Sequence, residues 1–503
     1  MINKVQREIP DDLKPFAGSD AFKQEKRRLI AEKTTVGTVV FLKSIEAVFD
    51  RLGIHDGMTL SFHHHLRNGD LVINRIAEEI KRRNLKDMTF AASSLFPNHS
   101  PLVPLIENGN ITGIVANYLN GPVAKAVSEG KLKKPLIMDT HGGRARAIES
   151  GDLLIDVAFI AAPSVDRFGN GSGKFGPAAC GTVGYAIPDL MYAKKVVLIS
   201  DYQTEQLNDP EFDHRYVDYV CMIDKIGDSE GIVSGTTKIT RDPVGRKIAR
   251  DTVSLLKELN LIKDGFSMQT GAGGVSLAVV EYIKNYMKSE NIKARFASGG
   301  ITAQYVELLE AGLVDTLYDV QCFDLKAAKS YRENRRHLAI SASKYGNPFE
   351  PSPTVDDLDF VILGATEVDL DFNVNVTTDS LGEIIGGSGG HADTAHGAKV
   401  TVIVTNLLKA RLPIIRDHVT TITTPGEDID IIVTERGIAI NPIRTDLIDL
   451  LKKSKLNIVP IARLIEIAHG IAGVPNIKGT SKEAIGYVRY RDGSYIDTLY
   501  KKL

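Results

Sequence analysis

Short apolar runs alternate with helical periods of apolar residues along most of this chain. Residues 58–62 and 88–92 are rich in β-forming side chains and predict strands. Between them, a helix is predicted over 71–83, with one apolar face made by Ile73, Ile76, Ala77 and Ile80. Further strands are predicted at 156–162 and 195–200. Strands that alternate with helices in this way are typical of parallel β/α units.

The second half of the chain begins with the same pattern as the first. Residues 264–270 resemble 56–62 in the order of their polar and apolar positions. In the second half a glycine loop follows, then an amphipathic helix over 275–287 and a strand over 294–297. The first half has the same succession, with a polar loop in place of the glycine loop. Agreement across strand, loop, helix and strand favours an α/β fold with two related open-sheet domains.

Glycine, threonine and proline interrupt the periodicity between 228 and 250, which places the join of the two halves there. The first residues are rich in Lys, Arg and Glu and show no sustained period. We therefore expect an N-terminal arm over 1–35, an N-terminal α/β domain over 36–235 and a C-terminal α/β domain over 236–503.

Composition limits the possible functions. The formal net charge of the 503 residues is −2 and charges of both signs are mixed, so no basic stripe suits nucleic acid. No long apolar run indicates a membrane span or a signal peptide, and we expect a cytoplasmic protein. Cys180, Cys221 and Cys322 lie far apart, without the spacing of a disulfide framework or a zinc site. They are predicted to be buried small side chains.

The loop Gly271-Ala272-Gly273-Gly274 lies between a predicted strand and a predicted helix. Glycine lets the backbone approach a ligand closely, and a helix start favours negative charge. The loop could therefore hold an oxyanion or a phosphate. The steric alternative stays open, because tight turns use glycine too, and the spacing is not that of a dinucleotide-binding loop.

A second glycine cluster, 386–390, contains Gly386, Gly387, Ser388, Gly389 and Gly390. So many glycines cost backbone entropy, and close approach of a ligand is favoured over a mobile surface loop. His391, Asp393 and His396 follow, but a single carboxylate and an uncertain register argue against a metal site. No metal is expected in this chain.

The corresponding loop of the first half carries His63, His64, His65, Arg67 and Asn68. These side chains supply many hydrogen-bond donors and one cation, which suits a polycarboxylate. A solvated loop, with one or two histidines at the helix start, is an equally weighted alternative.

At these residues the chain resembles the coenzyme A transferase superfamily and, within it, most closely the citrate lyase alpha-subunit family. The resemblance extends over nearly the whole chain. In the first half it rests on 156–163 and the Asp-x-x-Gly-Asn turn over 166–171. In the second half it rests on segments 271–274, 387–391 and 423–439.

The resemblance implies that transferases of the covalent kind have a glutamate near the strand after the glycine-loop helix, where it attacks the acyl thioester. Here that strand has no carboxylate, and Ser298 stands about where the glutamate would be. This departure implies acyl transfer without a glutamyl thioester. Glu367 is the nearest alternative nucleophile, and we expect it to hold neighbouring loops instead.

The reaction implied by the resemblance is acyl exchange: acetyl-carrier plus citrate gives citryl-carrier plus acetate. The backbone amides at Gly273, Gly274 and Gly389 are the expected oxyanion donors. Expected substrate contacts are made by His63, His64, His65, Arg67, Asn68, Gly271, Ala272, Gly387, Ser388, Gly390 and His391.

The implied partners are an acyl carrier (gamma) subunit, a citryl lyase (beta) subunit and further copies of this chain, with no nucleic acid or membrane. No tightly bound cofactor is expected, only a phosphopantetheine-type thioester on the carrier, or acetyl-coenzyme A in its place. Two alternatives remain: an acetate or acyl coenzyme A transferase, or thioester hydrolase, of the same fold, and a non-catalytic scaffold subunit.

Overall fold

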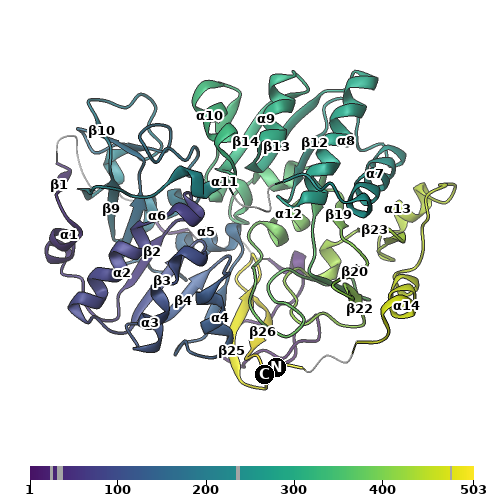
Figure 1. The fold of residues 1–503 in the computed structure, drawn as a ribbon, viewed down its shortest axis with the longest axis horizontal. Coiled ribbons are helices and arrows are strands. Elements are labelled where there is room, and N and C mark those ends of the chain that lie inside the picture. The colour runs from purple at the N-terminus through teal and green to yellow at the C-terminus, as the bar shows by residue number, and fades with distance from the viewer. Residues whose placement is uncertain (23–26, 31–37, 234–237, 476–478) are drawn as a thin grey trace.

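The computed structural model describes residues 1–22, 27–30, 38–233, 238–475 and 479–503. Figure 1 shows two α/β halves side by side, the first in purple and blue and the second in teal and green. Each half is built on a mostly parallel sheet with its own apolar core. The prediction of an α/β fold with two related open-sheet halves is confirmed.

The first sheet is mainly built from the first half of the chain, and its strands are parallel up to a final antiparallel pair. In order across the sheet they are β1 (Val40–Leu42), β11 (Tyr219–Met222), β9 (Lys195–Ser200), β6 (Val157–Ala161), β2 (Thr59–Phe62), β3 (Met88–Ala92), β4 (Ile111–Ala116), β5 (Leu136–Met138), β25 (Ala484–Arg489) and β26 (Tyr495–Tyr500).

The second sheet is also parallel except for its last strand. Its order is β15 (His337–Ala339), β14 (Val314–Cys322), β13 (Ala294–Ile301), β12 (Ser267–Thr270), β16 (Phe360–Leu363), β19 (Thr401–Val404), β23 (Ile431–Thr434) and β24 (Gly437–Ile440). Strands β11-β9-β6-β2-β3-β4-β5 and β23-β19-β16-β12-β13-β14-β15 therefore follow the same path. The repeat predicted from two short segments extends through both sheets.

The repeat includes a small turn after each central strand. In the first half, Asp166 accepts hydrogen bonds from the amide and side chain of Asn170, between β7 (Ser164–Asp166) and β8 (Gly171–Ser172). In the second, Asp369 accepts the same two bonds from Asn373, between β17 (Glu367–Asp369) and β18 (Val374–Asn375). The Asp-x-x-Gly-Asn motif is thus one copy of a repeated turn.

Helices cover the sheets where the apolar periods predict them. Helix α2 (Val72–Arg83) buries the four predicted residues Ile73, Ile76, Ala77 and Ile80. Helix α8 (Gly274–Glu290) begins one residue before the expected 275 and ends after the expected 287, and its C-cap residue Asn291 has a left-handed backbone. The other helices are α1 (Ile45–Leu52), α3 (Leu102–Glu107), α4 (Pro122–Ser128), α5 (His141–Ser150), α6 (Ile187–Tyr192), α7 (Pro243–Glu258), α9 (Ala303–Glu310), α10 (Leu325–Glu333), α11 (Ala342–Gly346), α12 (His391–Gly397), α13 (Thr445–Leu450) and α14 (Ile461–Ala472).

The end of the chain returns to the first sheet. Strand β25 pairs with β5 in parallel, and the yellow hairpin β25–β26 lies between the halves in Figure 1. The expected C-terminal domain, 236–503, therefore contributes its last strands to the sheet of the expected N-terminal one. The described part of the expected arm packs against this hairpin, where Phe16 donates its amide to the carbonyl of Tyr495.

Within the described ranges, no helix has both the length and the apolar character needed to cross a membrane.

Candidate active site

A cleft of about 440 Å³ lies where the two halves meet. The parallel strands β12, β13, β14 and β16 end at or beside it, which is where open α/β sheets place their ligands. The first half contributes Tyr118, His141 and Tyr185. The second half contributes Gln269, Thr270, Gly271, Ala272, Gly273, Ser276, Gly300, Phe323, Tyr345, Leu363, Gly364, Ala365, Thr366, Val376, Gly387, Ser388, Gly390 and His391.

Gly271, Ala272 and Gly273 of the first glycine loop line this cleft, whereas Gly274 does not, and a Cβ atom added at Gly274 would lie 2.8 Å from the carbonyl oxygen of Lys238. Gly273 caps the start of α8, and no side chain caps the helix. A Cβ atom added at Gly273 would meet no atom within 4 Å, and one at Gly271 would meet its nearest neighbours at 3.8 Å. The amide of Gly271 donates to the carbonyl of Ile362 at 2.8 Å, but the amides of Gly273 and Gly274 have no acceptor among the described residues. The loop therefore offers free N–H donors at a helix start.

The second glycine cluster has a different physical cause. A Cβ at Gly387 would lie 2.3 Å from the carbonyl oxygen of Asn117, and one at Gly390 would lie 2.3 Å from the hydroxyl of Tyr345. Gly389 has a positive φ of 50°, and its amide donates to the carbonyl of Asn117 at 3.1 Å. Atoms of the chain itself thus require these glycines, and Gly387, Ser388 and Gly390 also line the cleft, so the expected approach of a ligand stays a prediction. The amide of Gly389, an expected oxyanion donor, is already engaged.

The same cluster joins the halves next to the cleft. The carbonyl of Gly389 accepts from the amide of His141, the first residue of α5, at 2.8 Å. Asp393 on α12 accepts from the hydroxyl of Thr140 and the amide of Gly142, both at 2.8 Å. A carboxylate from the second half therefore stabilises the start of a helix in the first.

His391 lines the cleft with both ring nitrogens occupied. One bonds to the hydroxyl of Thr424 at 2.8 Å and the other to the carbonyl of Gly364 at 3.1 Å. Burial lowers the pKa of His391 to about 4, so the ring is neutral near pH 7. Since a neutral imidazole has one donor and one acceptor, this side chain is fully used in holding the wall of the cleft.

The three consecutive histidines are buried one layer behind the cleft. The ring of His64 stacks on Tyr185 with centroids 4.8 Å apart, and on His141 at 5.8 Å. Burial lowers the pKa of His63 to about 4 and the pKa values of His64 and His65 well below the usual range. Within the described part of the chain, neither ring nitrogen of His63 or His65 has a hydrogen-bond partner. Buried polar atoms without partners are rare, and here they lie in the loop whose His64 stacks on Tyr185 and His141 of the cleft.

Arg67 places a positive charge beside these histidines. Its guanidinium lies 4.9 Å from the ring centroid of Phe323, which lines the cleft, and 5.4 Å from that of Phe96. Burial lowers the pKa of Arg67, and its Nε and Nη1 atoms have no hydrogen-bond partner. No carboxylate of the described residues pairs with it. Arg67 itself is not among the residues that line the cleft and lies behind Phe323, while Asn68 is exposed and does not line the cleft either.

Ser298 and Glu367 have supporting roles in this geometry. Ser298 is buried in β13, and its hydroxyl donates to Oε1 of Gln269 at 3.1 Å. Glu367 is buried and accepts from the amide of Thr420 at 2.7 Å, from Nδ2 of Asn375 at 2.9 Å, and from Ser380 and Arg416. The expectation that Glu367 holds neighbouring loops is confirmed.

Sequence patterns did not reveal several residues of the cleft, namely Tyr118, His141, Tyr185, Gln269 and Tyr345. Burial lowers the pKa of His141 to about 3, and its Nδ1 atom has no partner. A strand followed by Thr140-His141-Gly142-Gly143 is a weak helix-start signal that could have indicated this histidine. The tyrosines lie in short turns or helices without any periodic pattern.

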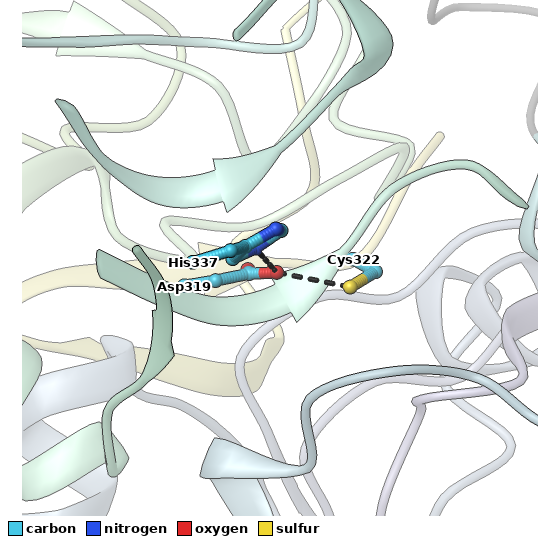
Figure 2. A group of neighbouring side chains, drawn as sticks. All are labelled: Asp319, Cys322 and His337. Atoms are coloured by element: carbon cyan, nitrogen blue, oxygen red, sulfur yellow. Dashed lines mark hydrogen bonds and ion pairs between the residues drawn. The ribbon is translucent and has the colours of Figure 1, made fainter. Parts of the chain in front are cut away.

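A group of side chains that could hold a metal ion lies in the second half (Figure 2). Asp319, Cys322 and His337 are buried, and Oδ2 of Asp319 lies 2.9 Å from both the thiol of Cys322 and Nε2 of His337. Burial raises the pKa of Cys322 well above its usual value, which keeps the thiol protonated. Hydrogen bonds alone therefore satisfy the group, and the expected lack of a metal stays a prediction.

Known proteins resemble the chain over almost its full length. Residues 39–502 match the family model described as citrate lyase, alpha subunit (CitF). The citrate lyase alpha chain of Haemophilus influenzae is 44% identical over 459 residues, covering 91% of this chain and 92% of the relative. The alpha chain of Klebsiella pneumoniae is 39% identical over 500 residues, covering 99% and 97%.

Solved structures agree with the sequence comparison. A structure from Streptococcus mutans, described as the alpha subunit of citrate lyase in complex with citrate, has a TM-score of 0.95 and 41% identity, with 100% of both chains covered. The malonate decarboxylase alpha subunit of Acinetobacter baumannii has a TM-score of 0.64 at 16% identity, covering 88% of this chain and 93% of that one, and shares the fold. The chain therefore belongs to the citrate lyase alpha-subunit family and is an enzyme subunit of the citrate coenzyme A-transferase type.

Proposed function

We propose that this chain moves an acyl group from a carrier-bound thioester to citrate, which gives a citryl thioester and acetate. The thioester is carried on a phosphopantetheine-type arm of an acyl carrier subunit, and cleavage of the citryl group belongs to a separate subunit. The Streptococcus mutans relative was solved with citrate, which supports citrate as the acceptor.

The observation that carries this proposal is the unpaired guanidinium of Arg67. A buried cation is normally paired with an anion, because removal of its water costs several kcal/mol. Among the described residues its Nε and Nη1 atoms have no hydrogen-bond partner, and the same holds for the ring nitrogens of His63 and His65 in the same loop. A tricarboxylate with a hydroxyl group supplies many acceptors for such donors, and Arg67 is suited to a bidentate carboxylate contact.

Acyl exchange then proceeds in two steps of the same kind. A citrate carboxylate attacks the acetyl carbonyl, the thiolate leaves, and a mixed anhydride of acetate and citrate is formed. The thiolate next attacks the citryl carbonyl of this anhydride, and acetate leaves. Each attack builds a tetrahedral oxyanion, for which the free amides of Gly273 and Gly274 are the proposed donors, each contributing about 3 kcal/mol.

The composition of the cleft supports a path without a covalent enzyme intermediate. Among the described residues that line it, none is an aspartate or a glutamate. Glu367 has its carboxylate oxygens occupied by the donors of neighbouring loops. The lack of a carboxylate among these described lining residues supports direct transfer, in which citrate brings its own nucleophile.

The experiment mixes the full chain with acetyl-coenzyme A and citrate and detects citryl-coenzyme A and acetate by mass spectrometry. We expect citrate-dependent formation of the new thioester, and no such product would refute acyl exchange. Borohydride is then added in the presence of acetyl-coenzyme A alone. A glutamyl thioester would be reduced and the enzyme inactivated, so retained activity is expected here, and inactivation would favour an ordinary covalent coenzyme A transferase.

A further inference from the structure

Three side chains, Ser298, Gln269 and Tyr345, form a row of hydrogen bonds that ends at the Tyr345 hydroxyl in the cleft. Ser298 on β13 donates its hydroxyl proton to Oε1 of Gln269 at 3.1 Å. Nε2 of Gln269 on β12 donates to the hydroxyl oxygen of Tyr345 at 2.7 Å. Gln269 and Tyr345 both line the cleft, whereas Ser298 is buried behind them.

This chain of hydrogen bonds has a direction. An amide offers separate acceptor and donor atoms, and the hydroxyl of Ser298 occupies the carbonyl end of Gln269. The NH₂ end therefore faces Tyr345, whose oxygen accepts a hydrogen bond. No described residue accepts the proton of the Tyr345 hydroxyl, so this O–H is left to donate into the cleft.

The packing around Tyr345 fixes this donor in place. Its ring lies in an apolar cluster with Tyr185 and Ala145 of the first half and Val355 and Leu358 of the second. The hydroxyl rests against Gly390, where an added Cβ would lie only 2.3 Å from the oxygen. Burial also raises the pKa of Tyr345, so the group remains a neutral donor over the working pH range. A donor held in this way needs no reorganisation when charge develops.

We propose that Tyr345 is a catalytic residue that donates a hydrogen bond to the tetrahedral oxyanion, and that Gln269 and Ser298 position it. The substrate class it serves is the carbonyl of an acyl thioester or of the derived anhydride. This inference rests on the proposed acyl exchange. The tyrosine neither donates nor accepts a proton in this step. The oxyanion collapses by expelling thiolate or acetate, so no proton transfer is needed.

The first test is Tyr345→Phe in the full chain, assayed with acetyl-coenzyme A and citrate. Loss of one oxyanion donor lowers kcat by about 10²- to 10³-fold and leaves the citrate KM within about threefold. Tyr331→Phe is the matched control, because its buried hydroxyl donates to Glu211 at 2.6 Å, away from the cleft. An unchanged kcat in Tyr345→Phe overturns the inference, whereas an inactive wild-type chain overturns the proposed function itself.

The second test, Gln269→Glu, addresses the direction of the relay with almost no change in shape. A carboxylate only accepts, so it would take the proton of the Tyr345 hydroxyl away from the cleft. We expect kcat to fall at least about tenfold, and the double variant Gln269→Glu/Tyr345→Phe to be within about threefold of Tyr345→Phe alone. A Gln269→Glu enzyme as fast as wild type would mean that Tyr345 donates to Gln269, and would overturn the relay.

The last test asks whether Ser298 acts by orienting the amide of Gln269 or only by packing. Ser298→Ala frees the amide of Gln269 to turn, so kcat should fall while citrate binding, measured by calorimetry, is retained. Ser298→Thr keeps the hydroxyl and should restore most of the rate. If Ser298→Thr is as impaired as Ser298→Ala, packing rather than the hydrogen bond matters, and Ser298 has no positioning role.

Discussion

Arg67 carries a positive charge that no carboxylate of the described chain neutralises. Replacement by alanine should raise the citrate KM by about ten- to hundredfold, because hydrogen bonds to charged groups contribute about 1.5–3 kcal/mol. Steady-state kinetics with acetyl-coenzyme A and varied citrate measure this change. Arg67→Lys should be intermediate, since lysine keeps the charge but loses the planar fork.

Arg75→Ala is the matched control for this prediction. Arg75 lies on the neighbouring helix α2, is 41% exposed and pairs with Glu78 and Asp224. Its removal should leave the citrate KM unchanged. A citrate KM that is equally unaffected in Arg67→Ala would exclude Arg67 as a citrate contact.

Glycines near the cleft separate into two kinds, which leads to a second prediction at single residues. A Cβ added at Gly273 or Gly364 meets no atom within 4 Å. Gly273→Ala and Gly364→Ala should therefore keep or slightly raise stability, by up to about 1 kcal/mol. They should still slow acyl exchange about ten- to hundredfold, because a methyl group in the cleft displaces the reacting atoms.

Gly470→Ala tests whether that loss is specific to the cleft. Gly470 lies inside α14 with open space around it, and alanine there should stabilise the helix without any effect on exchange. Gly387→Ala should instead destabilise by about 1–3 kcal/mol, because its Cβ would lie 2.3 Å from the carbonyl of Asn117. Thermal unfolding and the exchange assay together distinguish the three outcomes.

These glycines also indicate how far sequence alone could define the site. Gly271, Ala272 and Gly273 line the cleft, and the local order of strand, glycines and helix start was enough to single out this loop. Ligand binding by the loop stays a prediction. For the cluster 386–390 a second cause of the glycines could not be predicted, because the atoms that require glycine there, on Asn117 and Tyr345, are far away in the sequence. Tyr345 and Tyr185 could not be predicted, as single tyrosines in short elements carry no pattern.

At the scale of elements, the periodicity of apolar residues predicted several strands and helices correctly. Strands β3 and β9 begin and end at the predicted residues, and α2 buries its predicted face. The starts of α5 and α12 were not predicted to meet. They do so because Asp393 reaches across to the first turn of α5, a contact that depends on the packing of the two halves.

The Asp393 contact predicts a pH dependence of stability. Burial raises the pKa of Asp393 to about 6, from 3.8, while Arg491 acts in the opposite direction. An acid whose folded pKa is raised binds its proton more tightly in the folded state. Its favourable contribution is therefore complete below about pH 4 and is lost as the pH rises through about 6, by about 3 kcal/mol at most.

The asparagine of Asp393→Asn does not titrate. The difference in the free energy of unfolding between wild type and variant therefore isolates the contribution of Asp393 from that of the other carboxylates. Urea unfolding of both chains between about pH 4 and pH 7 should show the wild type losing stability relative to the variant as the pH rises. A difference that is constant over this range, or that grows in favour of the wild type, would contradict the raised pKa.

At the scale of the whole molecule, the end of the chain completes the sheet of its beginning. Strand β25 lies beside β5, and Arg489 at its end forms two hydrogen bonds to Asp139, at 2.6 and 2.7 Å. No local pattern could predict this pairing, because the partners are separated by 350 positions. The bond also ties the chain end to the residues just before α5, which carries His141.

Loss of Arg489 should therefore destabilise the molecule far more than loss of another cation of the same hairpin. Arg489→Met leaves Asp139 as an unpaired buried charge, which costs about 3–5 kcal/mol. Lys501→Met is the control: Lys501 pairs with Glu483 at 3.0 Å in an exposed position, and such pairs contribute less than about 1 kcal/mol. The double variant Asp139→Asn/Arg489→Met removes both charges and should recover part of the lost stability, because neither charge of the pair is then left buried without a partner.

Urea unfolding of the wild type and the three variants measures these differences in stability. If Arg489→Met is no less stable than Lys501→Met, the ion pair is dispensable for the attachment of β25 to the first sheet.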